Sequence, residues 1–273
     1  MKVMDCEFAK EFWRLCDDAW NLGWHEYHAG NLSYRLKREE TEMIREDLDA
    51  QGEWRELGSV YSQLAGEFFM VTSGGSSFHE ILKSPEELTG IVELDPDGRR
   101  YRVRWGLCGN HPTSELPAHL MNHAVKKAFC GDDYRIIYHA HPGNLTALSF
   151  VLPLSDEVFT RELWEMEPEC AMTFPAGMGV LPWCTPGSEE AAFASGEKMK
   201  VYDVILWAHH GAFASGKTFG DTFGLMYTVE KASEMLVKVL AMGGKRNVPT
   251  VENLRDLEEP FNLRFPEKFL YQK

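Results

Sequence analysis

The stretch that most constrains the fold spans residues 135–144 and reads Arg-Ile-Ile-Tyr-His-Ala-His-Pro-Gly-Asn. Its first half is apolar and rich in β-branched residues, and Pro142-Gly143 ends it, which is typical of a buried strand. Because side chains alternate across a strand, His139 and His141 should lie on the same side, about 6–7 Å apart. Two such imidazoles can share a divalent ion. They can equally be hydrogen-bonded or solvated histidines, so a metal site requires a third ligand elsewhere.

Strand-like and helix-like segments alternate along the whole chain. Apolar residues recur at helical spacing over residues 5–22 and 220–242. Strands are expected at residues 32–36, 67–71, 91–94, 101–105, 135–141, 171–174 and 204–207. This mixture predicts an α/β layered domain. Because no linker-like boundary interrupts it, residues 1–273 are expected to form one domain, with the charged stretch 37–66 as a surface excursion.

A third metal ligand is offered by His210, which follows the apolar strand 204–207 and precedes Gly211, where the backbone can turn tightly. If that strand persists, His209 points the other way, so only one of the two can face a metal. His119 and His123 are four residues apart on an expected helix and are also potential ligands. Their sequence, His-Leu-Met-Asn-His, lacks the Glu of a zincin motif, so this pair is interpreted as structural.

Two further segments suggest a place for a charged substrate. Glu115 is expected in the first turn of a helix for which Ser114 is the predicted N-cap. Such a carboxylate commonly only complements the helix dipole, but beside a metal it can shuttle protons near neutral pH. Residues 72–77 read Thr-Ser-Gly-Gly-Ser-Ser after a strand, and backbone N–H groups in such a loop can cradle a phosphate.

Charge and cysteine usage limit the partners and the compartment. The net charge of −14 argues against nucleic acid and anionic membranes as partners. Six cysteines without Cys-x-x-Cys spacing indicate reduced, scattered thiols. Neither a membrane-spanning run nor the apolar core of a signal peptide is visible, so a cytoplasmic protein is expected.

Three blocks of sequence together resemble the class II (zinc-dependent) sugar-phosphate aldolase family. These blocks are Thr113–His119, His139–Pro142 and Trp207–Gly211. Supporting stretches lie at residues 29–32, 71–75, 163–170 and 174–183, and the likeness covers roughly residues 8–242. The resemblance implies a single three-layer α/β domain with a central, mostly antiparallel or mixed sheet flanked by helices. It also implies a homotetramer.

The resemblance assigns roles to individual residues. It implies that His139, His141 and His210 hold one Zn²⁺ per subunit, that Glu115 is the catalytic acid/base, and that a neighbouring subunit contributes Glu169 as a second acid. The implied phosphate cradle consists of Gly30, Asn31, Ser73, Gly74, Thr113 and Ser114. Two positions depart from the family pattern. His28 stands where relatives carry Asn, and the loop at 72–75 reads Thr-Ser-Gly-Gly instead of Thr-Gly-Ser-Gly.

The implied activity is retro-aldol cleavage of a small sugar phosphate through a metal-stabilised enediolate. The block between Trp164 and Trp183 favours L-rhamnulose 1-phosphate as the substrate, with dihydroxyacetone phosphate and L-lactaldehyde as products. Cleavage of L-fuculose 1-phosphate and 4-epimerisation of L-ribulose 5-phosphate are the alternatives on the same scaffold. A binding protein with a structural zinc is the alternative from another class. Such a zinc usually has four protein ligands, and no cysteine lies near the three histidines to complete the set.

Overall fold

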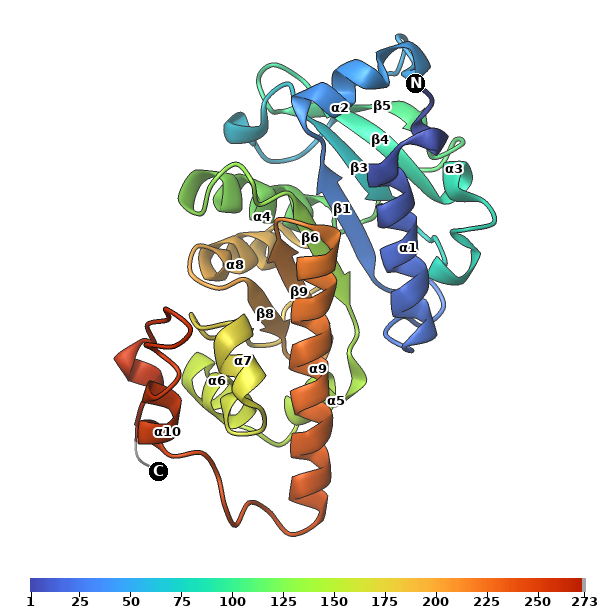
Figure 1. Ribbon diagram of the computed structural model, residues 1–273. Coiled ribbons are helices and arrows are strands. Elements are labelled where there is room, and N and C mark those ends of the chain that lie inside the picture. Colours follow the sequence, from blue (N-terminus) through green and yellow to red (C-terminus); the bar gives the residue numbers. More distant parts are fainter. Residues whose placement is uncertain (272–273) are drawn as a thin grey trace.

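A computed structural model describes residues 1–271, and a nine-stranded sheet runs through them (Figure 1). In chain order the strands are β1 Asn31–Arg35, β2 Arg55–Glu56, β3 Phe68–Thr72, β4 Thr89–Leu94, β5 Arg100–Gly106, β6 Ile136–Ala140, β7 Gly179–Leu181, β8 Val204–Trp207 and β9 Gly211–Gly216. Across the sheet the order is β2-β5-β4-β3-β1-β6-β9-β8-β7. Neighbours are antiparallel except β7 and β8, which are parallel. The expected mixed, mostly antiparallel sheet is confirmed.

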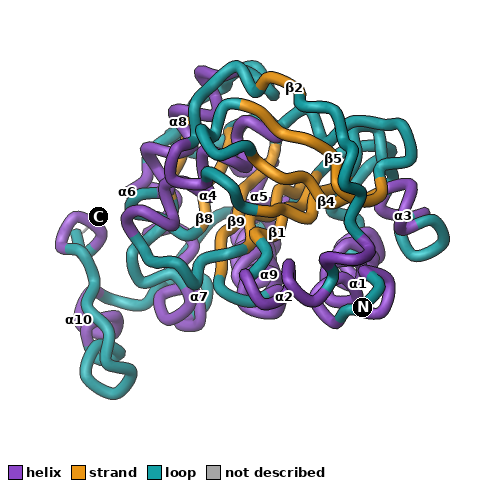
Figure 2. The backbone as a smooth tube through the Cα atoms, turned by 90° about the horizontal axis from the view of Figure 1, so that it is seen from above, coloured by secondary structure: helices purple, strands orange, loops and turns teal. Residues whose placement is uncertain are grey.

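Helices cover both faces of the sheet, which gives the expected three layers (Figures 1 and 2). One face carries α1 Glu7–Asn21, α5 Gly143–Leu148 and α9 Phe219–Ala241, and the other carries α4 Leu116–Phe129 and α8 Glu189–Met199. Adjacent residues of β1 show the division. Tyr34 contacts the rings of Phe8 on α1 and Phe219 on α9, whereas Ser33 faces α4.

Shorter helices complete the chain. They are α2 Arg38–Met43, α3 Pro85–Leu88, α6 Asp156–Trp164, α7 Pro168–Thr173 and α10 Val251–Arg255. Within residues 37–66, α2 and the edge strand β2 accompany irregular backbone, and Ile44, Tyr61 and Leu64 are buried. No helix among residues 1–271 combines the length and the apolarity needed to cross a bilayer.

The strand expected at residues 171–174 is wrong, because these residues belong to α7 and to its C-terminal end. Pro168 occupies the start of this helix, where its fixed φ suits the first turn, and Glu169 lies in that turn. Periodicity cannot distinguish a short buried helix from a strand over so few apolar residues. The consequence for the site is that Glu169 stands in the first turn of a helix.

Candidate metal centre and active site

Three histidines meet where β6 and β8 end and β9 begins, and we refer to them as the three-histidine centre. His139 lies in β6, His141 follows that strand by one residue, and His210 lies in the turn between β8 and β9. Because β6 pairs with β9, the strand end and the turn are neighbours. One ring nitrogen from each histidine lies within 4.8 Å of the others. The sheet topology therefore brings together the three residues that the sequence singled out.

Hydrogen bonds at the rear of two rings leave lone pairs at the centre. Nδ1 of His139 donates to the carbonyl of Ala212 at 3.0 Å, and Nδ1 of His141 donates to Glu26 Oε1 at 2.7 Å. In the neutral rings, which are the form that ligates a metal, a proton on Nδ1 leaves a lone pair on each Nε2, and the two Nε2 atoms lie 3.2 Å apart. Such an arrangement is unfavourable without a cation, and it matches the way proteins orient metal-binding histidines. The donors present therefore fit a divalent metal.

The protonation states of His139 and His210 suit metal binding. Burial lowers the pKa of His139 well below its ordinary value and lowers the pKa of His210 to about 4. Neutral imidazole is the form that ligates a metal. His209 turns away instead, with its backbone in the left-handed region at φ 65° and its Nδ1 3.1 Å from Ser149 Oγ. Of the two adjacent histidines, only His210 joins the centre.

Gly211 allows the histidine strands to approach each other closely. A Cβ atom at this position would lie 2.4 Å from the carbonyl oxygen of Ala140 and 2.7 Å from Cδ2 of His141. Any side chain here would therefore push β6 and β9 apart at the centre. The glycine is therefore needed for close approach and not for the turn expected from the sequence, because Gly211 begins β9 and the residue with positive φ is His209.

Glu115 lies beside the centre and is almost completely buried. It occupies the N-cap position of α4 rather than its first turn, so the prediction of Ser114 as the N-cap is wrong by one residue. Its Oε2 accepts a hydrogen bond from Asn31 Nδ2 at 2.8 Å and lies 3.4 Å from His139 Nε2. Burial raises the pKa of Glu115, and the bond from Asn31 opposes that rise. Glu115 is thus a buried carboxyl group with a raised pKa beside the three-histidine centre, which suits it to proton transfer.

A cavity of about 250 Å³ opens in front of the centre. It is lined by every residue of the expected phosphate cradle, by Glu115 and by the three histidines, together with His28, Ala29 and Gly75. No lysine or arginine is among these lining residues. Neutral donors and His28 would therefore have to hold an anion here.

The backbone part of the expected cradle needs a correction. The N–H group of Ser73 donates to the carbonyl of Leu88 at 2.9 Å, and the N–H group of Gly74 donates to the carbonyl of His111 at 2.7 Å. These two groups are already bonded within the protein, because the loop is attached to its neighbours as an extension of the sheet. The Asn31 side chain is likewise engaged, since its two ends contact Glu115 and His119. The hydroxyl groups of Ser73, Thr113 and Ser114 are the polar side chains of the cradle that line the cavity beside His28.

Two site features escaped the sequence analysis, and one expected residue lies elsewhere. Glu26, which orients His141, comes from an exposed loop with no motif to reveal it. His119, which the sequence analysis interprets as structural, contacts the side chain of Asn31 in the site. Its spacing of four residues from Glu115 places the two side chains on the same face of a helix, and this spacing is the signal in the sequence that points to the contact. Glu169 is exposed and does not line the cavity of its own chain.

Buried neutral histidines make a specific prediction about acid stability. Burial lowers the pKa of His25 and His119 to about 3, and it lowers the pKa of His123 well below the ordinary value. The unfolded chain binds a proton at each of them below about pH 6.5, whereas the folded chain does not. The free energy of unfolding of the metal-free protein should therefore fall below pH 6.5, by about 1.4 kcal/mol per pH unit for each histidine.

Urea unfolding measured from pH 7.5 to pH 5 checks this expectation. The variant His123→Gln should show a smaller dependence on pH than the parent, because one such group is removed. A parent protein whose unfolding free energy is constant over this range would contradict the burial of these rings as neutral imidazoles.

The fold and the site together define a class of protein: a three-layer α/β domain with an open three-histidine centre beside a buried carboxylate. Residues 10–237 match the class II aldolase and adducin N-terminal domain family, and the chain belongs to this family. It is 41% identical to a rhamnulose-1-phosphate aldolase of Mannheimia succiniciproducens over 262 residues, which are 96% of each chain. It is 40% identical to a rhamnulose-1-phosphate aldolase of Klebsiella pneumoniae over 96% of this chain and 95% of that one.

Solved structures support the same fold. A sugar-phosphate aldolase of Thermotoga maritima superposes with a TM-score of 0.75 at 30% identity, covering 88% of this chain and 97% of that one. The L-fuculose-1-phosphate aldolase of Thermus thermophilus superposes with a TM-score of 0.55 at 22% identity, covering 88% and 98%. The second likeness extends to the fold alone.

Proposed function

We propose that the protein is a zinc-dependent aldolase that cleaves L-rhamnulose 1-phosphate to dihydroxyacetone phosphate and L-lactaldehyde. The observation that carries the proposal is the three-histidine centre with the Glu115 carboxylate 3.4 Å from His139. Relatives about 40% identical over nearly the whole chain are named rhamnulose-1-phosphate aldolases. The T. maritima likeness supports the broader class of sugar-phosphate aldolases.

In this mechanism His139, His141 and His210 hold one zinc ion per chain. When bound, the ion acts as a Lewis acid toward the oxygens of a ketose, where retro-aldol cleavage develops negative charge. Three protein ligands leave room for the substrate in the coordination sphere. Glu26 and the carbonyl of Ala212 keep the two ligating rings in the required tautomer.

Glu115 moves the proton at the carbon that becomes nucleophilic when the carbon–carbon bond breaks. Burial raises its pKa, which favours the protonated form more than in an ordinary glutamate and helps the group to return a proton as well as to accept one. Asn31 holds the carboxylate by one oxygen beside the centre. A lysine that forms a Schiff base is not needed, and no lysine lines the cavity.

The phosphate lies against the hydroxyl groups of Ser73, Thr113 and Ser114, with His28 as the fourth donor. The net charge of −14 repels an anion at long range, so these local donors must select the phosphate. His28 is exposed where it lines the cavity, and its ring packs against that of Tyr27 with ring centroids 3.7 Å apart and the ring planes tilted. The free cysteines agree with a cytoplasmic location, which is part of the proposal.

Glu169 completes the site from a neighbouring subunit of a homotetramer and exchanges the proton on the hydroxyl that becomes the aldehyde. Its exposed position on α7, away from the cavity of its own chain, is consistent with this role. A shared site makes a clear prediction for mixed oligomers. Inactive Glu169→Ala and His139→Ala chains, dissociated and reassembled in equal amounts, should regain about a quarter of the parental activity per site.

The reason is statistical, because about one interface in four then joins an intact histidine centre to an intact Glu169. Activity of the reassembled mixture measures the effect, and mass analysis establishes that mixed oligomers have formed. Each variant reassembled alone is the control and should stay inactive. Mixed oligomers without activity would rule out action of Glu169 on a neighbour's site.

The decisive experiment combines metal analysis with a cleavage assay on three substrates. About one zinc per chain is expected, with the highest kcat/KM on L-rhamnulose 1-phosphate and less on L-fuculose 1-phosphate. L-Ribulose 5-phosphate tests the epimerase alternative. A preference for either of the other substrates would replace the proposed specificity. A tightly bound zinc with no activity on any of the three would favour the structural zinc protein.

A further inference from the structure

A continuous row of buried polar side chains lies between the sheet and α4, where apolar residues would be expected. It consists of Asn31, Ser33 and Arg35, which share one face of β1, and of Glu115, His119 and His123, which recur every four residues along α4. All six are buried. Burying polar groups costs free energy unless they are hydrogen-bonded, so six aligned polar side chains suggest a role other than filling the core. We call these six residues the polar row.

Hydrogen bonds join five members of the polar row in sequence. Asn31 Nδ2 contacts Glu115 Oε2 at 2.8 Å, and Asn31 Oδ1 contacts Nε2 of His119. Ser33 Oγ contacts Nδ1 of His119 at 2.6 Å and Nε2 of His123 at 2.8 Å. The chain of contacts therefore runs from His123 to the carboxylate beside the three-histidine centre.

The chemistry of the groups fixes the direction of every bond. A carboxylate only accepts, so the Asn31 amide must turn its NH₂ group toward Glu115 and its oxygen toward His119. Since that oxygen also only accepts, the proton of His119 must be on Nε2. The ring is neutral, because burial lowers the pKa of His119 to about 3, and its Nδ1 therefore accepts from the Ser33 hydroxyl. Ser33 in turn accepts from His123. All four bonds donate toward Glu115.

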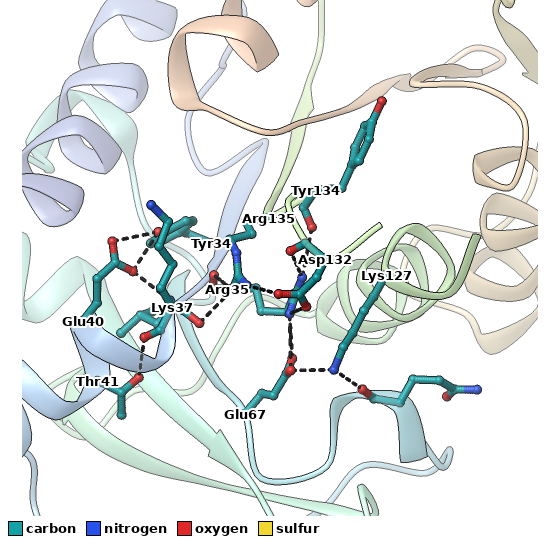
Figure 3. A network of polar contacts seen from close by, with 12 residues as sticks. Tyr34, Arg35, Lys37, Glu40, Thr41, Glu67, Lys127, Asp132, Tyr134 and Arg135 are labelled. Atoms are coloured by element: carbon teal, nitrogen blue, oxygen red, sulfur yellow. Dashed lines mark hydrogen bonds and ion pairs between the residues drawn. The ribbon is translucent and has the colours of Figure 1, made fainter. Parts of the chain in front are cut away.

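The far end of the row does not open to solvent. Arg35 is a permanent cation held by Glu67 and Asp132, with ion-pair distances of 3.2 and 2.9 Å, and Lys127 is bonded to the same Glu67 (Figure 3). Burial lowers the pKa of His123, and the positive charge of Arg35 lowers it further. His123 is also fully buried, and its Nδ1 has no hydrogen-bond partner among residues 1–271, so the row ends inside the protein. The row can therefore orient groups but does not lead from Glu115 to solvent at this end.

We propose that His119 is a positioning residue for the reaction: by donating to Asn31 it fixes the orientation of the amide, and the amide holds the Glu115 carboxylate in place for proton transfer. The proposal rests on the proposed aldolase function. Without the donor on His119, the Asn31 amide is free to flip and to present its oxygen to Glu115. The carboxylate would then lose its partner and its fixed distance to the centre.

Two variants that replace His119 by a side-chain amide, one longer and one shorter, test this inference. In His119→Gln the side-chain amide reaches about as far as Nε2 and can still donate to Asn31. In His119→Asn the shorter amide reaches about as far as Nδ1, so it keeps a partner for Ser33 but leaves Asn31 without a donor. Loss of an outer-shell partner commonly lowers activity by about 10- to 100-fold. We expect that loss in kcat for His119→Asn, with KM changed by less than about 3-fold, and recovery of most of kcat in His119→Gln.

A double-mutant cycle shows whether His119 acts through Glu115. The substitution His119→Asn should lower kcat strongly in the parent protein and hardly at all in the Glu115→Gln background, where the group that it positions is already lost. A purely structural role for His119 would lower kcat equally in both backgrounds. Zinc content and thermal unfolding are measured for each variant. If His119→Asn folds poorly, Ser33→Ala takes its place: it removes the hydroxyl that holds Nδ1 of His119, so the ring that donates to Asn31 is no longer fixed, and it is judged by the same comparison.

The outcomes separate this inference from the proposed function. If the parent protein cleaves none of the three sugar phosphates, the proposed function fails and the inference falls with it. Suppose instead that the parent protein is active and that the His119→Asn variant is folded, loaded with zinc and turns over with the parental kcat. Only the inference is then overturned. Equal losses in His119→Gln and His119→Asn would overturn it as well, because donation to Asn31 would then not be the relevant property.

Discussion

Replacement of His139 by alanine is expected to empty the metal site and abolish turnover together. His139 is the most deeply buried member of the three-histidine centre, and its Nε2 faces that of His141 across 3.2 Å. Removing it leaves two ligands, which cannot hold zinc as three do. Because Lewis-acid stabilisation amounts to several kcal/mol, kcat should fall by at least about 10³-fold. Metal analysis and the cleavage assay on L-rhamnulose 1-phosphate measure the two effects.

His209→Ala is the matched control, since His209 is adjacent in sequence to His210 but bonds to Ser149 outside the centre. This variant should keep about one zinc per chain and most of its activity. If His209→Ala lost its zinc and His210→Ala kept it, the third ligand would be misassigned. Adding zinc to His139→Ala should not restore turnover.

Replacement of Glu115 by glutamine is expected to lower kcat by roughly 10²–10⁴-fold while the zinc content stays at the parental value. Glutamine keeps the shape of the side chain but cannot accept a proton at the carbon. Near-parental turnover in a fully metallated Glu115→Gln protein would remove this residue from the mechanism.

Glu26, an exposed carboxylate next to the centre, provides the comparison for Glu115. Its Oε1 lies 2.7 Å from Nδ1 of His141, and Glu26→Gln alters this contact. It should weaken zinc binding by about 10- to 100-fold, because the partner that fixes the ligand tautomer is changed. With saturating zinc it should recover most of its turnover, unlike Glu115→Gln. The two carboxylates on either side of the centre thus have distinguishable effects.

Local sequence patterns were sufficient to single out the three histidines as candidate ligands. The alternation that places His139 and His141 on one side depends on residues two apart, and the strand that ends before His210 is recognised from four apolar residues and a glycine. The strands expected at 91–94 and 101–105 and the helix expected at 220–242 were predicted for the same reason, and they correspond to β4, β5 and α9. Each of these features is set by neighbours in the chain, so one sequence suffices.

Only the tertiary structure decided which partners the site residues have. Asn31 bonds to Glu115 across 84 positions, Ser33 to His119 across 86, and Glu26 to His141 across 115. No periodicity encodes such pairs, because they depend on which strands become neighbours and on which helix covers them. The same holds for α7, whose few apolar residues fit a strand or a helix until they pack against α6 and α9. The sequence by itself indicated three candidate ligands, because strand alternation and strand ends are local features, and the family resemblance added the role of the Glu115 carboxylate. The fold determined the polar row that reaches this carboxylate, because its hydrogen bonds join residues far apart in the chain.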